Sequence, residues 1–188
     1  MGLDTDEIVA RCRRALSEST PPLAVRDVLA DLVRRPASLE AAFDPVVEGG
    51  IQTLHRADDL TVLRIAWTPG ISLNPHEHAM WAVVGLYGGQ EDNAFYRHSP
   101  DGLQSAGGRS LQANDVLVLG DDAIHAVANP RREFAVALHV YGGDFFEGKR
   151  SEWDPVTFEE RPRDLEGTRR LFERANLAWR AEEERRQP

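Results

Sequence analysis

The middle of the chain, from residue 49 to residue 146, is a succession of short apolar or alternating segments separated by turn-forming residues. Short segments that recur roughly every ten residues between such turns are typical of antiparallel sandwiches and barrels. About eight strands fill a small jelly-roll barrel, whose mouth can hold one small ligand. The expected strands are 51–56, 60–68, 81–88, 92–98, 109–112, 115–119, 124–129 and 133–141.

Both flanks of this β-rich region have the periodicity of helices. Apolar residues at helical spacing predict amphipathic helices over 3–18 and 23–34, a short helix over 38–43 and a long helix over 164–186. The expected fold class is therefore mainly β, with N-terminal helices and a long C-terminal helix. We divide this single domain into an N-terminal helical segment (1–48), the barrel (49–146) and a C-terminal extension (147–188).

Composition narrows the possible partners and compartments. The net charge of −9 argues against nucleic acid, because nucleic-acid-binding domains carry basic patches. No apolar run approaches the length of a membrane helix, so we expect no membrane partner. The N-terminus lacks a signal-peptide core and the single cysteine, Cys12, allows no internal disulfide, which together favour the cytoplasm. Cys12 falls on the apolar stripe of the first helix, so we expect it to be buried.

His76-Glu77-His78 is the segment most suggestive of chemistry. Side chains two residues apart point to the same face of a strand, so one strand can present both imidazoles to a single metal ion. His125 begins a later predicted strand and is the candidate third ligand. Three neutral imidazoles leave open positions on a metal, although imidazole suits iron, zinc, copper and nickel alike. Taken alone, a His-x-His pair is also compatible with a chance pair at the surface.

The histidines stand in a wider pattern, which consists of Gly70, His76, His78, Gly89, Gly120, His125 and Asn129. The pattern resembles the two sequence motifs of the cupins, which are double-stranded β-helix (jelly-roll) barrels that hold a metal at the mouth. In cupins an acidic ligand usually follows the second histidine after four or five residues, and here those positions are Ala82 and Val83. Glu77 does not replace it, because its side chain points to the opposite face of the strand.

The segment from His125 to Tyr141 narrows the resemblance further. It is similar to the thiol dioxygenases, which include cysteine dioxygenase and 3-mercaptopropionate dioxygenase, and the similarity covers roughly half of the chain. In that family three histidines hold Fe(II), and a Ser-x-His-x-Tyr triad lies beside them. The resemblance implies that His139 orients the catalytic hydroxyl of Tyr141. It also implies Fe(II) as the cofactor, with three ligands: His76, His78 and His125.

The chain departs from that family at several positions. Ala137 stands where the family has the serine of the triad, and the cysteine that cross-links the tyrosine in animal cysteine dioxygenases has no counterpart. Family members hold the substrate carboxylate through an upstream residue, which is arginine for cysteine and glutamine for 3-mercaptopropionate. Gln52 falls nearest to that place and is the candidate for substrate binding, with Thr53 and Arg56 as neighbouring alternatives.

The resemblance implies Fe(II)-dependent dioxygenation of a small thiol carboxylate to the sulfinic acid, with 3-mercaptopropionate ahead of cysteine. The partners would be the small thiol and O₂, and the choice between monomer and homo-oligomer stays open. Two alternatives remain. One is a cupin oxygenase that acts on another small organic substrate, and the other is a non-catalytic cupin that binds a metal or small ligand. The retained pair His139 and Tyr141 speaks against a pure binder, which has no need of it.

Overall fold

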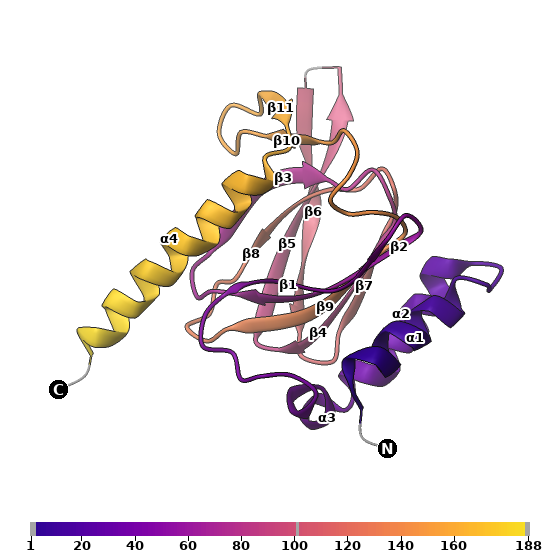
Figure 1. Cartoon of the computed structure of the whole chain (residues 1–188). Coiled ribbons are helices and arrows are strands. Elements are labelled where there is room, and N and C mark those ends of the chain that lie inside the picture. The colour runs from indigo at the N-terminus through magenta and orange to yellow at the C-terminus, as the bar shows by residue number, and fades with distance from the viewer. Residues whose placement is uncertain (1–2, 101, 187–188) are drawn as a thin grey trace.

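The computed structural model describes residues 3–100 and 102–186, which form a β-barrel with helices on two sides. The N-terminal helices lie against one side of the barrel, and the C-terminal helix crosses the opposite side (Figure 1). Within the described residues, no helix combines the length and the apolar character that crossing a membrane requires. The helices are α1 (Thr5–Ala15), α2 (Pro21–Val33), α3 (Pro36–Ala41) and α4 (Leu165–Glu184).

Two antiparallel sheets make the barrel, and they confirm the predicted double-stranded β-helix. One sheet has the strand order β1-β2-β9-β4-β7 and the other the order β11-β10-β3-β8-β5-β6. Most neighbours are distant in sequence, which is the crossover pattern of a jelly roll. The strands are β1 (Gly50–Ala57), β2 (Leu60–Trp67), β3 (Ser72–Glu77), β4 (Ala82–Gly88), β5 (Gln90–Ser99), β6 (Gly102–Gln112), β7 (Val116–Leu119), β8 (Ile124–Ala128), β9 (Ala135–Tyr141), β10 (Ser151–Trp153) and β11 (Glu160–Pro162).

The central strands β2, β4 and β9 are buried along almost their whole length, because both faces of their sheet are covered. One face lines the barrel interior, where Leu63 and Ile65 join the inner core. The other face packs against α1 and α2, so that Val62 shares a second core with Leu29. Cys12 belongs to this second core, as predicted, and burial raises the pKa of its thiol to about 12.

The prolines begin helices here instead of ending them. The sequence pattern places Pro21 before the second helix and Pro36 after it, but each proline occupies the first turn of the helix that follows. The first turn of a helix leaves its N–H groups without partners, so a residue that lacks an N–H costs nothing there. The second helix therefore starts earlier than predicted, at Pro21.

The strand that carries the first histidine is missing from the sequence-based prediction. His76 was expected at the start of the segment 81–88, but it lies near the end of a separate strand, β3, and His78 follows that strand. Pro75 interrupts the sequence pattern because proline cannot donate to a ladder. The structure accommodates it by a register shift between Leu73 and His76 in the pairing with β8.

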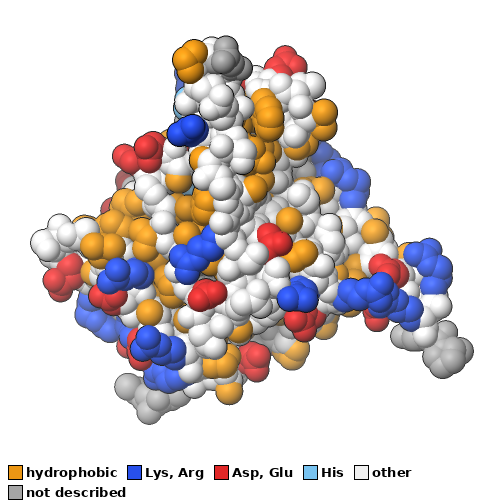
Figure 2. Space-filling model, turned by 180° about the vertical axis from the view of Figure 1, so that it is seen from behind, with side chains coloured by type: hydrophobic (Ala, Val, Ile, Leu, Met, Phe, Trp, Pro, Cys, Tyr) orange, Lys and Arg blue, Asp and Glu red, His pale blue; other side chains and the backbone are white. Residues whose placement is uncertain are grey.

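The C-terminal helix is fixed to the barrel by one buried amide. Asn176 accepts hydrogen bonds from the backbone N–H of Gly49 at 2.9 Å and from the Thr68 hydroxyl at 2.7 Å, and it donates to the Gly49 carbonyl at 2.9 Å. A Cβ atom at Gly49 would lie 2.0 Å from the Thr68 hydroxyl, so this approach requires glycine. Phe172 adds a stacked contact with Trp67, at 5.4 Å between ring centroids. Charged side chains of both signs gather toward the far end of α4, at the right-hand edge of Figure 2.

Candidate metal centre

Three histidines meet at one end of the barrel interior. His76 in β3 is paired directly with His125 in β8, and His78 follows β3. All three are buried, and each offers a nitrogen that lies within 4.8 Å of the other two. The structure therefore brings together the three predicted metal ligands, which come from two adjacent strands and the loop after β3.

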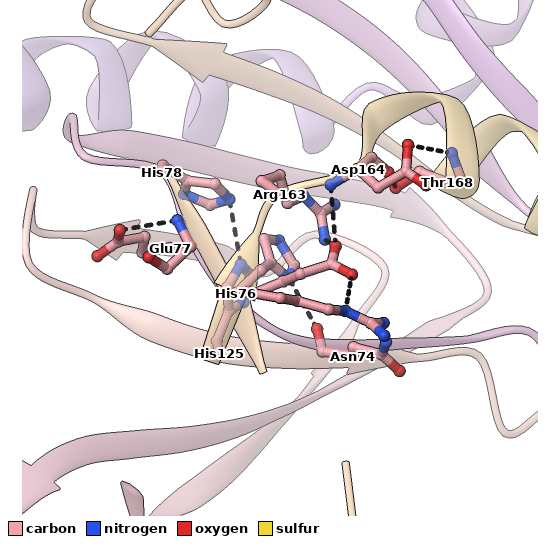
Figure 3. A network of polar contacts seen from close by, with 12 residues as sticks. Asn74, His76, Glu77, His78, His125, Arg163, Asp164 and Thr168 are labelled. Atoms are coloured by element: carbon pink, nitrogen blue, oxygen red, sulfur yellow. Dashed lines mark hydrogen bonds and ion pairs between the residues drawn. The ribbon is translucent and has the colours of Figure 1, made fainter. Parts of the chain in front are cut away.

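Hydrogen bonds orient two of the three imidazoles. His76 Nδ1 lies 2.9 Å from the carbonyl oxygen of Asn74, to which it donates, and His125 Nδ1 lies 2.8 Å from Oδ1 of Asn93. A proton on Nδ1 leaves the lone pair on Nε2, the atom free to bind a metal. The Nε2 atoms of His78 and His125 face each other at 3.3 Å (Figure 3).

The protein environment keeps these histidines neutral. Burial lowers the pKa of His76 and His78 well below 6.5, and the neighbouring Arg163 and the other histidines add to the effect. Burial also lowers the pKa of His125 to about 4, although Glu91 opposes it. Neutral imidazole is the form that binds metals. The convergence of buried Nε2 atoms thus fits a metal ion, and a set of three imidazoles leaves its identity open.

Tyr141 and His139 lie beside the histidine cluster on β9. The Tyr141 hydroxyl is 3.3 Å from Nδ1 of His139, and the Tyr141 ring contacts the ring of His78 edge-on at 5.1 Å. Burial and the charge of Glu91 raise the pKa of Tyr141, so its hydroxyl keeps its proton at neutral pH. The side chains of all five of these histidine and tyrosine residues line the same cavity.

Glu91 lies next to the site, and the sequence analysis does not single it out. Its carboxylate is fully buried and accepts hydrogen bonds from the Trp67 indole at 2.6 Å and from the Asn93 amide at 3.0 Å. His139 Nε2 lies 3.7 Å from the same carboxylate. Burial acts to raise the pKa of Glu91, but His139 and these donors outweigh it and hold the pKa below its usual value. The available signal was the spacing of Glu91 and Asn93, which share one face of β5, but the predicted strand 92–98 began one residue after Glu91.

The cavity above the histidines has a volume of about 690 Å³ and reaches as far as α4. Pockets of roughly 300–1,000 Å³ are the usual size for small-molecule sites. Its walls are mainly apolar and are formed by Ile51, Ile65, Trp67, Leu73, Val127, Phe145, Phe146, Leu165, Phe172 and Leu177. Its lining also includes charged residues, which are Glu48 just before β1 and Glu166, Arg169, Glu173 and Arg180 on α4.

Arg163 is the second residue that the sequence analysis missed. It lies between the histidines and the first turn of α4 (Figure 3) and lines the cavity, with a side chain only 7% exposed. Arg163 pairs with Glu152 at 3.2 Å, but Glu152 also pairs with Arg161 at 2.8 Å. One carboxylate thus serves two guanidinium groups, which leaves positive charge at the wall of the site. A basic residue in a polar C-terminal stretch gives no sequence signal for such a role.

The structure does not bring Gln52 to this cavity. Gln52 is opposite Arg64 in the β1–β2 ladder, and its side chain accepts a hydrogen bond from that arginine on the outer face. Thr53, opposite Leu63, has the inward position and lines the cavity. The prediction for Gln52 fails because alternation tells which residues share a face but not which face is inside.

Glu77 does not join the ligands, as expected from its place between the two histidines. Its carboxylate accepts a hydrogen bond from the backbone N–H of Ser151 at 2.9 Å and points away from His76 and His78 (Figure 3). This contact ties the segment after β9 to β3, so the role of Glu77 is structural.

Comparison with known proteins concerns the fold. No family model matches the sequence. Solved structures similar to the chain include a cupin from Methanocaldococcus jannaschii, with 8% identity over 55% of this chain and 89% of that one and a TM-score of 0.47. The strand order of its own two sheets makes the fold of this chain a double-stranded β-helix. A cupin from Desulfitobacterium hafniense DCB-2 has 17% identity over 55% and 86% of the two chains with a TM-score of 0.44, and an oxalate oxidase has 17% identity over 52% and 53% with a TM-score of 0.40. Likenesses of this size say nothing about the reaction of this protein.

Proposed function

We propose that this protein is a cupin and an Fe(II)-dependent dioxygenase that converts a thiol carboxylate, such as 3-mercaptopropionate or cysteine, into the sulfinic acid. The observation that carries the proposal is the placement of Tyr141 and His139 in one buried cavity with three neutral histidines. The overall reaction adds both atoms of O₂ to the thiol sulfur, so it needs no other oxidant or reductant. When bound at the histidines, iron would supply acidification of the thiol and activation of O₂.

The protein residues have separate tasks in this proposal. His76, His78 and His125 hold the metal, and their neutrality leaves its charge available to an anionic substrate. The Tyr141 hydroxyl lies beside them as a polar group for the bound substrate, and His139 orients it. Arg163 binds the substrate carboxylate in place of the predicted Gln52, because it is the buried cation in the wall next to the histidines.

The experiment is to load the metal-free protein with Fe(II) and to supply 3-mercaptopropionate or cysteine in air-saturated buffer. We expect oxygen uptake and an equal amount of sulfinate, measured by an oxygen electrode and by mass spectrometry. Zinc-loaded protein and the His125→Ala variant are the controls, since neither supplies redox-active iron at the site. No oxygen uptake and no sulfinate with any small thiol would contradict the proposal.

The cavity favours a second candidate, in which a cupin oxygenase acts on another organic substrate. Its volume of about 690 Å³ exceeds what a thiol acid with a handful of non-hydrogen atoms fills. A panel that contains thiols and oxygen-sensitive compounds without sulfur, such as diketones, separates the two candidates. Oxygen uptake with the sulfur-free compounds alone would favour the second.

A further inference from the structure

The cavity has two chemically different parts. At its inner end the three histidines lie near Arg163, and farther out the wall is built from apolar side chains of β1, β2 and α4. Trp67 and Phe172 form a stacked pair in the wall of the cavity. We infer that the substrate of this site is an amphipathic acid, whose carboxylate and reacting group lie at the inner end and whose apolar body extends along α4.

The arginines near the histidines favour a substrate with a negative charge at the inner end of the cavity. Arg163 and Arg150 are both buried, and Glu152 is the acidic partner of Arg163. Glu152 is shared with Arg161, and within the described residues no carboxylate forms an ion pair with Arg150. Arg150 instead stacks on Phe145 and donates to its carbonyl oxygen. A substrate carboxylate at Arg163 would pair with a guanidinium whose one ion-pair partner, Glu152, is shared with Arg161.

The apolar walls of the outer part of the cavity favour a substrate with an apolar substituent. Ile51 and Ile65 are opposite each other in the β1–β2 ladder and both line the cavity, as does Phe172 on the facing helix. Burial of an aromatic or branched substituent between these walls would remove apolar surface from water on both sides. A bare 3-mercaptopropionate cannot make this contact, because it ends at its carboxylate.

The inference rests on the proposed function only for the identity of the reacting group, which is the thiol. A suitable probe is 3-mercapto-3-phenylpropionate, compared with 3-mercaptopropionate and with 3-phenylpropionate, which lacks the thiol. Binding to the Fe(II)-loaded protein is measured by calorimetry without oxygen. We expect the phenyl-substituted thiol to bind about tenfold or more tightly than 3-mercaptopropionate, since burial of a phenyl group is worth at least that much.

Two variants locate the two ends of the substrate. Ile51→Trp fills the apolar part at a partly exposed position, and it should remove most of the phenyl advantage while 3-mercaptopropionate binds as before. Val156→Trp adds the same ring at an exposed position outside the cavity and should change neither affinity. Arg163→Gln should weaken both acids about tenfold or more but leave the corresponding phenyl-substituted thiol alcohol unaffected.

The outcomes separate this inference from the proposed function. An equal or weaker affinity for the phenyl-substituted thiol, insensitive to Ile51→Trp, would overturn the inference even where 3-mercaptopropionate yields sulfinate. Binding of 3-phenylpropionate that depends on Ile51 and Arg163, without sulfinate from any thiol, would support the inference and contradict the thiol chemistry. Since Ile51 is partly exposed, its variant tests the idea even where Arg163→Gln fails to fold.

A second inference rests on a different observation, the orientation of the Asn93 amide. Its NH₂ group donates to Glu91, so its carbonyl oxygen is the atom that faces His125. This forces the proton of His125 onto Nδ1 and leaves Nε2 for a metal. We propose that Glu91 is a positioning residue that fixes the tautomers of both His125 and His139.

The carboxylate of Glu91 also determines which nitrogen of His139 carries the proton. Ala137 has no hydroxyl to offer, and Nε2 of His139 has no hydrogen-bond partner among the described residues, but the Glu91 carboxylate lies 3.7 Å away and its charge favours a proton on that nitrogen. A proton held on Nε2 leaves the lone pair on Nδ1, so the Tyr141 hydroxyl donates to His139 at 3.3 Å. One buried carboxylate thereby sets the direction of hydrogen bonds toward the metal ligand and toward the tyrosine.

Nitrogen NMR of the ¹⁵N-histidine-labelled, metal-free protein tests this directly. We expect His125 in the Nδ1–H form and His139 in the Nε2–H form in the wild-type chain. Glu91→Gln should mix the tautomers and weaken binding of Co(II), used as a probe metal, by about tenfold. Glu91→Asp, which keeps the charge, should restore part of this affinity. The opposite tautomers in the wild-type protein would overturn the inference without any variant, as would Glu91→Gln with unchanged tautomers.

Discussion

Gln52 and Thr53 are consecutive in the chain but point to opposite faces of β1. Thr53 is opposite Leu63, which is in turn opposite His139, so these side chains share the inner face of the sheet. Gln52 is opposite Arg64 and lies outside, where Arg64 also binds the Tyr87 hydroxyl at 2.8 Å. The residue at the expected carboxylate position is therefore separated from the cavity by the sheet itself.

Replacement of Gln52 tests this placement. We expect Gln52→Ala to leave KM and kcat for a thiol acid unchanged within about twofold, because its contact with Arg64 is at the surface. Thr53→Val keeps the size of the inward side chain and serves as the matched comparison on the other face. Steady-state kinetics under O₂ give the answer, and a tenfold rise in KM for Gln52→Ala would show that the glutamine reaches the substrate.

Removal of one histidine should abolish metal binding. His125→Ala takes one of three buried ligands from the cluster, so we expect at least a 100-fold loss of affinity for Co(II) or Fe(II). Elemental analysis and the rise in Tm on metal addition measure it, since a ligand that binds only the folded state stabilises that state. His55→Ala is the control, because His55 lies outside the cavity. An equal metal-induced rise in Tm for His125→Ala would rule out the proposed ligand set.

Tyr141→Phe should separate chemistry from metal binding. The variant keeps the ring that packs on His78 and loses the hydroxyl that contacts His139. We expect unchanged metal content and a fall in kcat on the order of 10²-fold, the usual loss when one hydrogen-bonding group in a reaction site is removed. A variant that binds metal and turns over at the wild-type rate would assign Tyr141 to packing alone.

The buried histidines predict how stability depends on pH. In the metal-free protein their folded-state pKa values lie below 6.5, at about 4 for His125, with burial as the first cause. Between these values and 6.5 the unfolded chain binds protons that the folded chain does not, so the free energy of unfolding decreases as pH falls. The slope should approach about 1.4 kcal/mol per pH unit for each histidine.

Urea unfolding of the metal-free protein between about pH 7 and pH 5 measures this slope. His125→Ala should show a shallower dependence, because one such histidine is gone. A free energy of unfolding that stays constant over this range would mean that the folded chain accepts the protons, contrary to the burial of the cluster.

The buried amide of Asn176 should hold α4 in place. Asn176→Leu keeps the approximate volume but leaves the Gly49 N–H and carbonyl group without partners, which should cost about 1–3 kcal/mol of unfolding free energy. Hydrogen exchange should also accelerate across α4. Glu173→Gln, on the same helix, is the matched control and should change stability by less than about 0.5 kcal/mol. Equal stability of the two variants would show that the amide does not anchor the helix.

Much of the fold follows from local patterns in the sequence. Alternation and turn residues predict most of the barrel strands, and helical periodicity predicts α1, α2 and α4. The strand β3 was not predicted, because Pro75 interrupts the alternating pattern. Its pairing with β8 is a long-range contact that accommodates Pro75 by a register shift. The short strands β10 and β11 were not predicted either, because a segment of three residues is too short to show an alternating pattern.

Some residues of the candidate site could likewise be predicted from the sequence, and others could be found only in the structure. The spacing of His76 and His78, with His125 in a later predicted strand, let the sequence by itself predict the metal-ligand trio, and the resemblance to the thiol dioxygenases added His139 and Tyr141. Only the tertiary structure decided that Gln52 faces outward, and that Glu91 and Arg163 lie next to the histidines. The physical reason is that a period of two groups side chains into faces, whereas the pairing of distant strands selects the inner face and its cross-strand neighbours. A buried Glu or Arg cannot be told from a surface one until that pairing is known.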